Sequence, residues 1–137
     1  MQLQQDDDGW YLMLHDGVVQ LIQIDFRLGL FLSDALDKAQ LYIETPCRLK
    51  HHEADVLLKP AETSSLGPAL ALFNARVMRI VIRKTGQLKV EFGDGYSLDV
   101  HPDDASEAWQ IVCSTGLMLV CSPGGSVSLF QRTEKEV

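Results

Sequence analysis

The stretch from Arg76 to Pro102, RVMRIVIRKTGQLKVEFGDGYSLDVHP, decides the fold class of this 137-residue chain. It predicts three consecutive β-strands joined by two tight turns. Apolar residues fall at every second position from Leu88 to Phe92 and again from Tyr96 to Val100, which is typical of half-buried strands. The run from Val77 to Ile82 is apolar on both faces, which indicates an interior strand.

The turn between the last two of these strands fixes their register, because cross-strand partners must share a face. A two-residue turn at Asp94-Gly95 would place apolar residues opposite polar ones. A three-residue loop that also includes Gly93 places Val90 opposite Leu98 and keeps the apolar residues together. The sequence therefore predicts the three-residue loop, with Gly95 in the left-handed conformation.

A looser copy of this meander precedes it, with strands expected at 18–25, 28–32 and 40–45. The apolar residues of the two copies correspond in order, and the length differences fall in the turns, where insertions are tolerated. The shared order favours an internal duplication. The corresponding pairs are Val19 and Val77, Ile22 and Ile80, Ile24 and Ile82, Leu28 and Leu88, Leu30 and Val90, Leu32 and Phe92, Leu41 and Leu98, and Ile43 and Val100.

The length of the chain fits one domain made of two half-repeats. Residues 1–8 are polar and predict a disordered lead-in. A single β-rich domain is expected over 9–131, with half-repeats at 9–58 and 66–131, followed by a frayed tail at 132–137. Gly9 to Leu14 predicts a short strand or an aromatic plug over the core, and the run from His15 to Gly17 predicts a turn.

The segment between the halves predicts one short helix over 66–74, with Leu66, Leu70 and Phe73 on its apolar face. Three more strands are expected at 107–113, 117–121 and 126–130. The predicted fold class is therefore mainly β. Two duplicated three-stranded antiparallel meanders should form a sandwich or half-open barrel, with the helix between the halves.

The charge and the cysteines limit the partners and the compartment. The formal net charge is −7, which argues against binding to nucleic acid or to an anionic membrane surface and permits a basic protein partner. No apolar run approaches the roughly 20 residues of a membrane helix, and the N-terminus lacks the features of a secretory signal. The three cysteines form no CxxC pair, so free, buried thiols in a reducing, cytoplasmic compartment are expected.

Candidate catalytic and metal-binding residues are few. His51, His52 and Glu53, with Asp55, form the densest set of metal-ligand types. Neighbouring histidines on a strand face opposite ways, which favours a solvated loop. Cys113 or Cys121 could be imagined as a nucleophile, but both lie in apolar strand patterns, so core thiols are expected. We expect no enzymatic activity and no cofactor.

Short segments spread over nearly the whole chain resemble a known family. They are Gly9-Trp10, Gly67-Pro68, Gly86, Gly93-Asp94-Gly95, Glu107-Ala108-Trp109-Gln110 and Pro123-Gly124-Gly125. With these segments the chain resembles DUF6188, a family of small bacterial proteins of unknown function. The resemblance implies a compact β-rich domain. Small acidic bacterial proteins of this kind often sit beside secreted toxin genes and look like immunity proteins, so it also suggests that role.

Three hypotheses about function follow. The first is a non-enzymatic immunity protein that neutralises a cognate toxin by direct binding, with acidic residues facing a basic partner. The second is a small-ligand-binding protein or small enzyme that uses a cleft between the two halves. The third is a homodimer that forms through an exposed strand edge. The acidic residues expected to bind the toxin are Asp34, Asp37, Glu44, Glu53, Asp55, Asp103 and Asp104.

Overall fold

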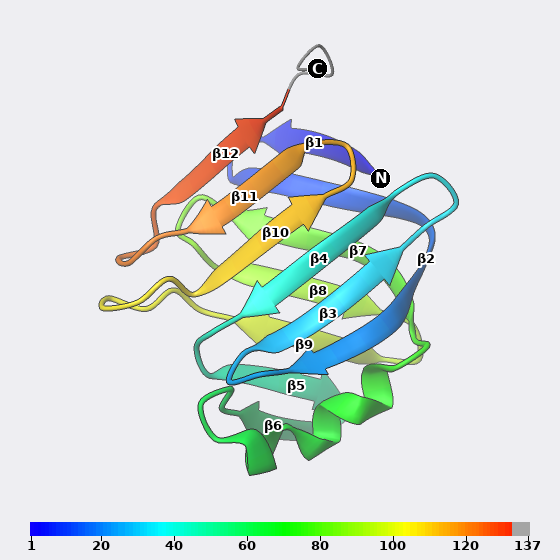
Figure 1. The fold of residues 1–137 in the computed structure, drawn as a ribbon, viewed down its shortest axis with the longest axis vertical. Coiled ribbons are helices and arrows are strands. Elements are labelled where there is room, and N and C mark those ends of the chain that lie inside the picture. The colour runs from blue at the N-terminus through cyan, green and yellow to red at the C-terminus, as the bar shows by residue number, and fades with distance from the viewer. Residues whose placement is uncertain (133–137) are drawn as a thin grey trace.

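The computed structural model describes residues 1–132, which form twelve antiparallel strands and one short helix (Figure 1). The predicted mainly β fold is confirmed. The strands are β1 (Gln2–Asp6), β2 (Gly9–Ile24), β3 (Leu28–Ser33), β4 (Lys38–Ile43), β5 (Cys47–His51), β6 (Ala54–Leu58), β7 (Arg76–Arg83), β8 (Leu88–Phe92), β9 (Tyr96–Val100), β10 (Trp109–Cys113), β11 (Leu117–Cys121) and β12 (Val127–Gln131), and the helix is η1 (Thr63–Leu72).

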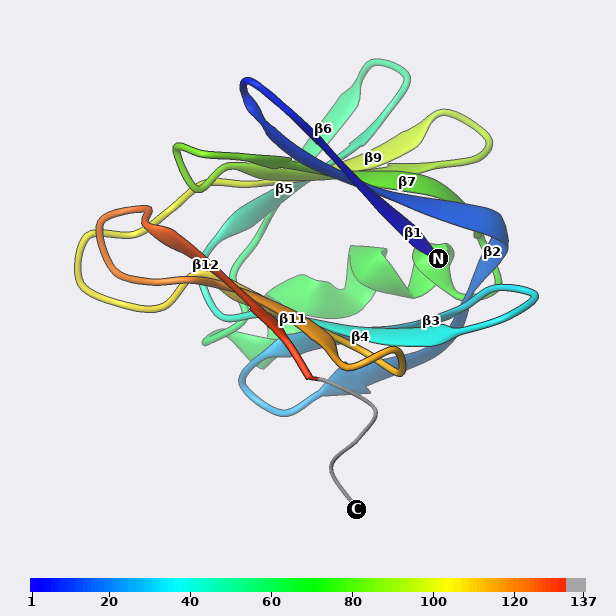
Figure 2. The ribbon, with the colours of Figure 1, turned by 90° about the horizontal axis from the view of Figure 1, so that it is seen from above.

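All twelve strands belong to one sheet that folds over on itself and does not close into a barrel. Its order is β12-β11-β10-β4-β3-β2-β7-β8-β9-β5-β6, with β1 beside β2. The 16-residue β2 belongs to both layers, because its first part pairs with β7 and its second part pairs with β3. Figure 2 shows the two layers, and Figure 1 shows η1 beside β6 at one end of the molecule. The predicted sandwich is therefore built from a single continuous sheet.

The predicted three-residue loop between β8 and β9 is confirmed. Val90 pairs with Leu98 and Lys89 pairs with Asp99, so paired side chains lie on the same face of the sheet. Gly95 has a φ of 80°, and Asp94 before it has a φ of 59°. Both residues are thus left-handed, whereas the sequence predicted this conformation only for Gly95.

The two meanders match in register as well as in strand order. Ile22 pairs with Leu30 in the first copy, and the corresponding residues Ile80 and Val90 pair in the second. Each copy also has one register shift at the same place, directly after Val19 in the first and after Val77 in the second. The apolar pairs aligned by sequence therefore occupy equivalent places, and their origin by duplication stays a prediction.

The last strands of each half are exchanged between the layers. β5 follows β4 in the chain but pairs with β9, so that Cys47 lies opposite Val100. β10 follows β9 but pairs with β4, so that Trp109 lies opposite Ile43. Each half therefore completes the sheet of the other half.

The prediction of a disordered lead-in over residues 1–8 was wrong, because β1 pairs with β2 along its whole length. The aspartates that suggested disorder form the turn between these strands. Asp6 accepts hydrogen bonds through Oδ1 from the backbone N–H groups of Asp8 and Gly9, at 2.8 and 2.9 Å. A short acidic side chain that binds the following backbone is a common turn device.

The turn predicted from His15 to Gly17 is instead an irregularity inside β2. Asp16 has a φ of 56°, and the pairing of β2 with β7 shifts between Met13 and Gly17. Such a bulge bends a strand without ending it. It lies where β2 passes from one layer to the other.

The helix is present, but its predicted apolar face was wrong. η1 is a 3₁₀ helix, which repeats every three residues rather than every 3.6. Leu66, Ala69 and Leu72 are therefore buried, while Leu70 and Phe73 are each 59% exposed.

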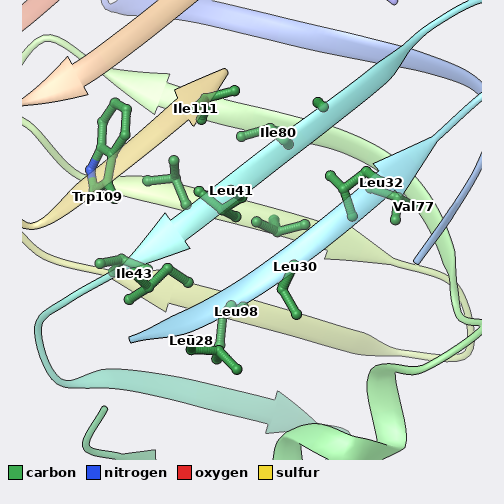
Figure 3. Packing of buried hydrophobic residues seen from close by; sticks show 14 of the residues in the cluster. Leu28, Leu30, Leu32, Leu41, Ile43, Val77, Ile80, Leu98, Trp109 and Ile111 are labelled. Carbon is green, nitrogen blue, oxygen red and sulfur yellow. The ribbon is translucent and has the colours of Figure 1, made fainter. Parts of the chain in front are cut away.

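Side chains from both layers fill the space between them (Figure 3). Leu30, Leu41 and Ile111 come from three neighbouring strands of one layer and are fully buried. Ile80 and Leu98 from the other layer are fully buried as well. The predicted tail at 132–137 lies outside the described residues except for Arg132, whose N–H donates to the carbonyl of Gly116 at 3.0 Å.

Candidate functional site

The seven acidic residues predicted to bind a toxin do not form one surface. They lie in four separate segments, and the β3–β4 loop is on the opposite side of the molecule from the β9–β10 loop (Figures 1 and 2). The sheet topology separates these segments, because the exchange of strands between the halves places their loops at different ends of the molecule. The β3–β4 loop holds Asp34 and Asp37, Glu44 follows β4, the β5–β6 hairpin holds Glu53 and Asp55, and the β9–β10 loop holds Asp103 and Asp104.

Asp34 is enclosed and is used inside the protein. Its side chain has an exposed fraction of 0% and lies 3.0 Å from the Met1 amine. Its carboxylate accepts hydrogen bonds from the backbone N–H groups of Leu36, Asp37 and His15 at 2.9, 2.8 and 3.2 Å. Burial alone would raise the pKa of Asp34, but these donors outweigh it and hold the pKa well below its usual value. A partner cannot reach this carboxylate in the folded protein.

Replacing Asp34 by asparagine is expected to lower the free energy of unfolding at neutral pH by about 1–3 kcal/mol, because charge-assisted hydrogen bonds are lost. The lowered pKa means that the unfolded state binds more protons in acid. The advantage of the natural protein should therefore be complete above a pH of about 4 and shrink as the pH falls below it. Urea unfolding of both proteins across this range measures the effect. Exposed Asp104→Asn is the control, and equal stability of Asp34→Asn and the natural protein at neutral pH would contradict the role.

Three other predicted acids also have partners within the protein. Asp37 pairs with the Met1 amine at 2.8 Å. Asp55 pairs with Arg48 at 3.3 Å, and both side chains are about half exposed. Asp103 accepts hydrogen bonds from the backbone N–H groups of Ala105 and Ser106, each at 2.9 Å. These contacts shape surface loops, and Glu44, Glu53 and Asp104 are exposed members of the set that take no part in them.

The outer face of the layer that contains β7, β8, β9 and β5 is charged. One row of cross-strand neighbours on this face consists of Arg79, Glu91, Ser97, Lys50 and Asp55. Arg79 forms an ion pair with Glu91. Lys50 reaches Asp99 in the adjacent row at 2.9 Å. We call this surface the ionic face, and its opposite charges largely satisfy one another.

The outer face of the other layer is different in kind. Cross-strand neighbours in β2, β3, β4, β10, β11 and β12 form one row across six strands, which we call the apolar row. Gln40 is its one polar member. Leu21 is 47% exposed and Phe130 is 56% exposed at the two ends of the row, and the apolar residues between them are half-buried. The row consists of Leu21, Phe31, Gln40, Val112, Met118 and Phe130.

The apolar row and the charged row of the ionic face occupy equivalent places in the two layers. Phe31 stands where the other copy has Glu91, because each follows the register shift of its own meander. In the same way, Val112 corresponds to Lys50. The inner faces are apolar in both copies, since both line the core. The layers thus differ in their outward-facing residues, and an apolar row on an outer face is a candidate interaction surface.

An aromatic corner lies beside the apolar row. The rings of Phe31 and Tyr42 meet edge to face with centroids 6.0 Å apart. The guanidinium of Arg27 lies 4.4 Å from the centre of the Tyr42 ring and pairs with Asp25 at 2.8 Å. The Asp25 carboxylate raises the pKa of Arg27, and Tyr42 and Glu44 add to this. Glu44 is therefore the one predicted acid that lies at this site.

This composition resembles that of known protein interfaces. Binding surfaces combine an apolar centre with a polar rim, and tyrosine and arginine dominate their energetics. The sequence analysis missed these residues because it searched for charge. A comparison of outward positions between the two copies would have found them, since Phe31 and Glu91 alternate with equivalent core residues.

The histidines lie together, contrary to the expectation that they face opposite ways. His52 has a φ of 53°, which brings its ring to 4.3 Å from that of His51. The His51 ring also stacks on Tyr96 with centroids 3.8 Å apart. Within residues 1–132, no group of three or more metal-ligand side chains gathers around one point. The pair is best described as part of an aromatic stack on a hairpin.

The three cysteines are free and buried, which confirms their predicted state. Burial raises the pKa of Cys47 to about 12 and that of Cys113 to about 11. Burial also raises the pKa of Cys121. Because the thiolate is the reactive form, these shifts disfavour a nucleophilic role.

The most distinctive segments of the chain meet at one junction between the layers. Trp109 is fully buried and donates a hydrogen bond through Nε1 to the carbonyl oxygen of Gly86 at 2.8 Å. Gly125 packs against the same turn, so that an added Cβ would lie 2.4 Å from the carbonyl oxygen of Thr85. The segments that contain Gly86, Trp109 and Gly125 thus hold the two layers together.

The fold and its surfaces define a two-layer antiparallel β protein with a filled interior and an apolar row on one outer face. The chain belongs to DUF6188, a family of unknown function whose sequence profile matches residues 10–131. The resemblance seen in the short segments is thereby confirmed. Searches among curated proteins and among solved structures give no match. Across residues 1–132, no helix has the length and apolar character needed to cross a membrane.

Proposed function

We propose that this protein is a non-enzymatic protein-binding module whose binding surface is the apolar row with its aromatic corner. The observation that carries the proposal is the contrast between the outer faces of the two layers. The ionic face satisfies its own charges, whereas the apolar row leaves Leu21 and Phe130 about half exposed. Covering such a surface is favourable by about 25 cal/mol per Å² of apolar area.

The filled interior disfavours the alternative hypothesis of a ligand site between the two halves. That site would need open space between the layers, where Trp109, Ile111 and Leu98 are fully buried (Figure 3). Small-molecule sites are concave and largely pre-formed. The hydrophobic core occupies the place that such a cleft would need.

The partner that best fits this surface is a bacterial toxin, with the protein acting as its cytoplasmic immunity protein. The net charge of −7 favours encounter with a basic partner, since complementary potentials speed association. At the surface itself, Glu44 supplies negative charge beside the aromatic corner, where Asp25 is paired with Arg27. Asp34 and Asp103, which the sequence had suggested, accept hydrogen bonds from the backbone of their own loops instead.

Co-expression with the product of the adjacent gene tests this function. The expected result is a stable complex that protects cells from that product. Phe31→Glu gives the apolar row the residue found at the equivalent place in the other copy, and we expect the loss of about 2 kcal/mol of binding, or roughly 30-fold in the dissociation constant.

Glu91→Gln on the ionic face is the matched control, since an exposed ion pair contributes little to stability. It should bind like the natural protein. Neither binding nor protection by the natural protein would reject the toxin partner. The unfolding temperature of each variant shows whether it is folded. If both folded variants bound the toxin equally well, the binding surface would lie outside the apolar row.

A further inference from the structure

Strand β12 has one free edge. It pairs with β11 on one side, and no strand of residues 1–132 lies on its other side. The strand at the opposite end of the sheet, β6, has η1 packed against it. The five residues of β12, VSLFQ, contain no charge and no proline, which are the usual devices that keep an edge strand from pairing.

The hydrogen bonds of β12 show which backbone groups face this free edge. The N–H of Ser122 donates to Ser126 and that of Arg132 donates to Gly116. Hydrogen-bonded and non-bonded pairs alternate along an antiparallel ladder. Ser128 and Phe130 therefore direct their backbone groups to β11, and the residues between and beside them direct theirs outward. The outward residues are Val127, Leu129 and Gln131.

We propose that two copies of this chain pair through their β12 strands, antiparallel about a two-fold axis at Leu129. Leu129 is the middle residue of β12, so this register gives every residue of the strand a partner in the second strand. Leu129 exchanges both backbone hydrogen bonds with Leu129 of the second copy, and Val127 does the same with Gln131. The result is one continuous sheet through both molecules.

The side chains fit this register. Leu129 is 40% exposed and comes to lie directly beside its own copy at the axis. Phe130 is 56% exposed and lies opposite Ser128 of the second copy, whose small side chain leaves room for the ring. Because Phe130 ends the apolar row, pairing brings the two apolar rows end to end on one face. The dimer goes beyond the proposed function and leaves that face open to a partner.

The mass in solution tests the dimer, using light scattering on the full chain over a concentration series. The natural protein should reach twice the 15.3-kDa mass of one chain. Leu129→Pro removes an outward N–H while leaving the bonds to β11 in place, so it should stay at the mass of one chain. A natural protein that remains a single chain up to its solubility limit would overturn the proposal.

A cysteine cross-link tests the register and does not depend on how well the proline variant folds. Leu129→Cys places two thiols at the axis, within the Cα separation that a disulfide spans. Air oxidation should convert it to a covalent dimer. Leu57→Cys in β6 is the matched control, because Leu57 has the same 40% exposure, and it should remain a single chain. Equal cross-linking of the two variants, or none in Leu129→Cys, would overturn the proposed axis.

Discussion

Replacement of Trp109 by alanine is expected to lower the free energy of unfolding by about 3–5 kcal/mol, the range for truncating a buried large aromatic side chain. The ring is fully buried between the layers and lies opposite Ile43 across the exchanged strand pair. Its loss would leave a cavity where the two halves of the chain meet. Since small domains are stable by only about 5–15 kcal/mol, urea unfolding should show a large drop in the midpoint.

Trp109→Phe separates the packing of the ring from its hydrogen bond. Phenylalanine keeps an aromatic ring in the core but cannot donate to the carbonyl oxygen of Gly86. Leaving a buried acceptor short of its main partner costs about 1–3 kcal/mol. We therefore expect Trp109→Phe to lie between the natural protein and Trp109→Ala. A loss of stability in Trp109→Ala no larger than in Trp109→Phe would show that the ring contributes little through packing.

The second large effect is expected at Gly125. Its φ is 97°, and a Cβ there would lie 2.4 Å from the carbonyl oxygen of Thr85. Gly125→Ala should therefore suffer about 1–2 kcal/mol of left-handed strain and about 1–3 kcal/mol more because the β7–β8 turn must move. Thermal unfolding of the variant should show a drop of several degrees.

Gly124→Ala is a close control for this substitution. Gly124 has a similar φ of 88°, but nothing lies within 4 Å of the place where its Cβ would stand. Only the strain of the backbone should appear in this variant. If the two substitutions destabilised the protein equally, the contact between Gly125 and the β7–β8 turn would not contribute to stability.

The meanders could be predicted from the sequence because their information is local. The alternation of apolar and polar residues from Leu88 to Phe92 assigns each residue to one face of the sheet. Because residues paired across two strands must lie on the same face, this alternation sets the register with β9. Two local errors also have local causes. The polar β1 shows no alternation because most of its residues are exposed. In η1, Leu66 and Leu70 have the spacing of one face of an α-helix, although the helix that forms is a 3₁₀ helix.

The exchange of β5 and β10 could not be predicted, because strand partners far apart in the chain have no local signal. Cys47 and Val100 are apolar strand residues like many others. The same topology decides which loops are neighbours, so the acidic site predicted around Asp34 and Asp103 had no geometric support. Glu44 alone of the predicted residues lies beside the aromatic corner. The apolar row crosses strands from both halves and becomes visible only in the folded sheet.

The crossed arrangement of β5–β6 and β10–β11 has a consequence for synthesis on the ribosome. When the first half leaves the ribosome, one edge of β4 has no partner strand and the β5–β6 hairpin has no strand to pair with. The strands that complete the pairing of β4 and β5 come later in the chain. The free edge of β4 can pair only after β10 (Trp109–Cys113) has been made, and that of β5 can pair only after β9 (Tyr96–Val100) has been made. The nascent chain therefore carries unpaired apolar strands until most of it has been made, and its two halves must reach the native state together.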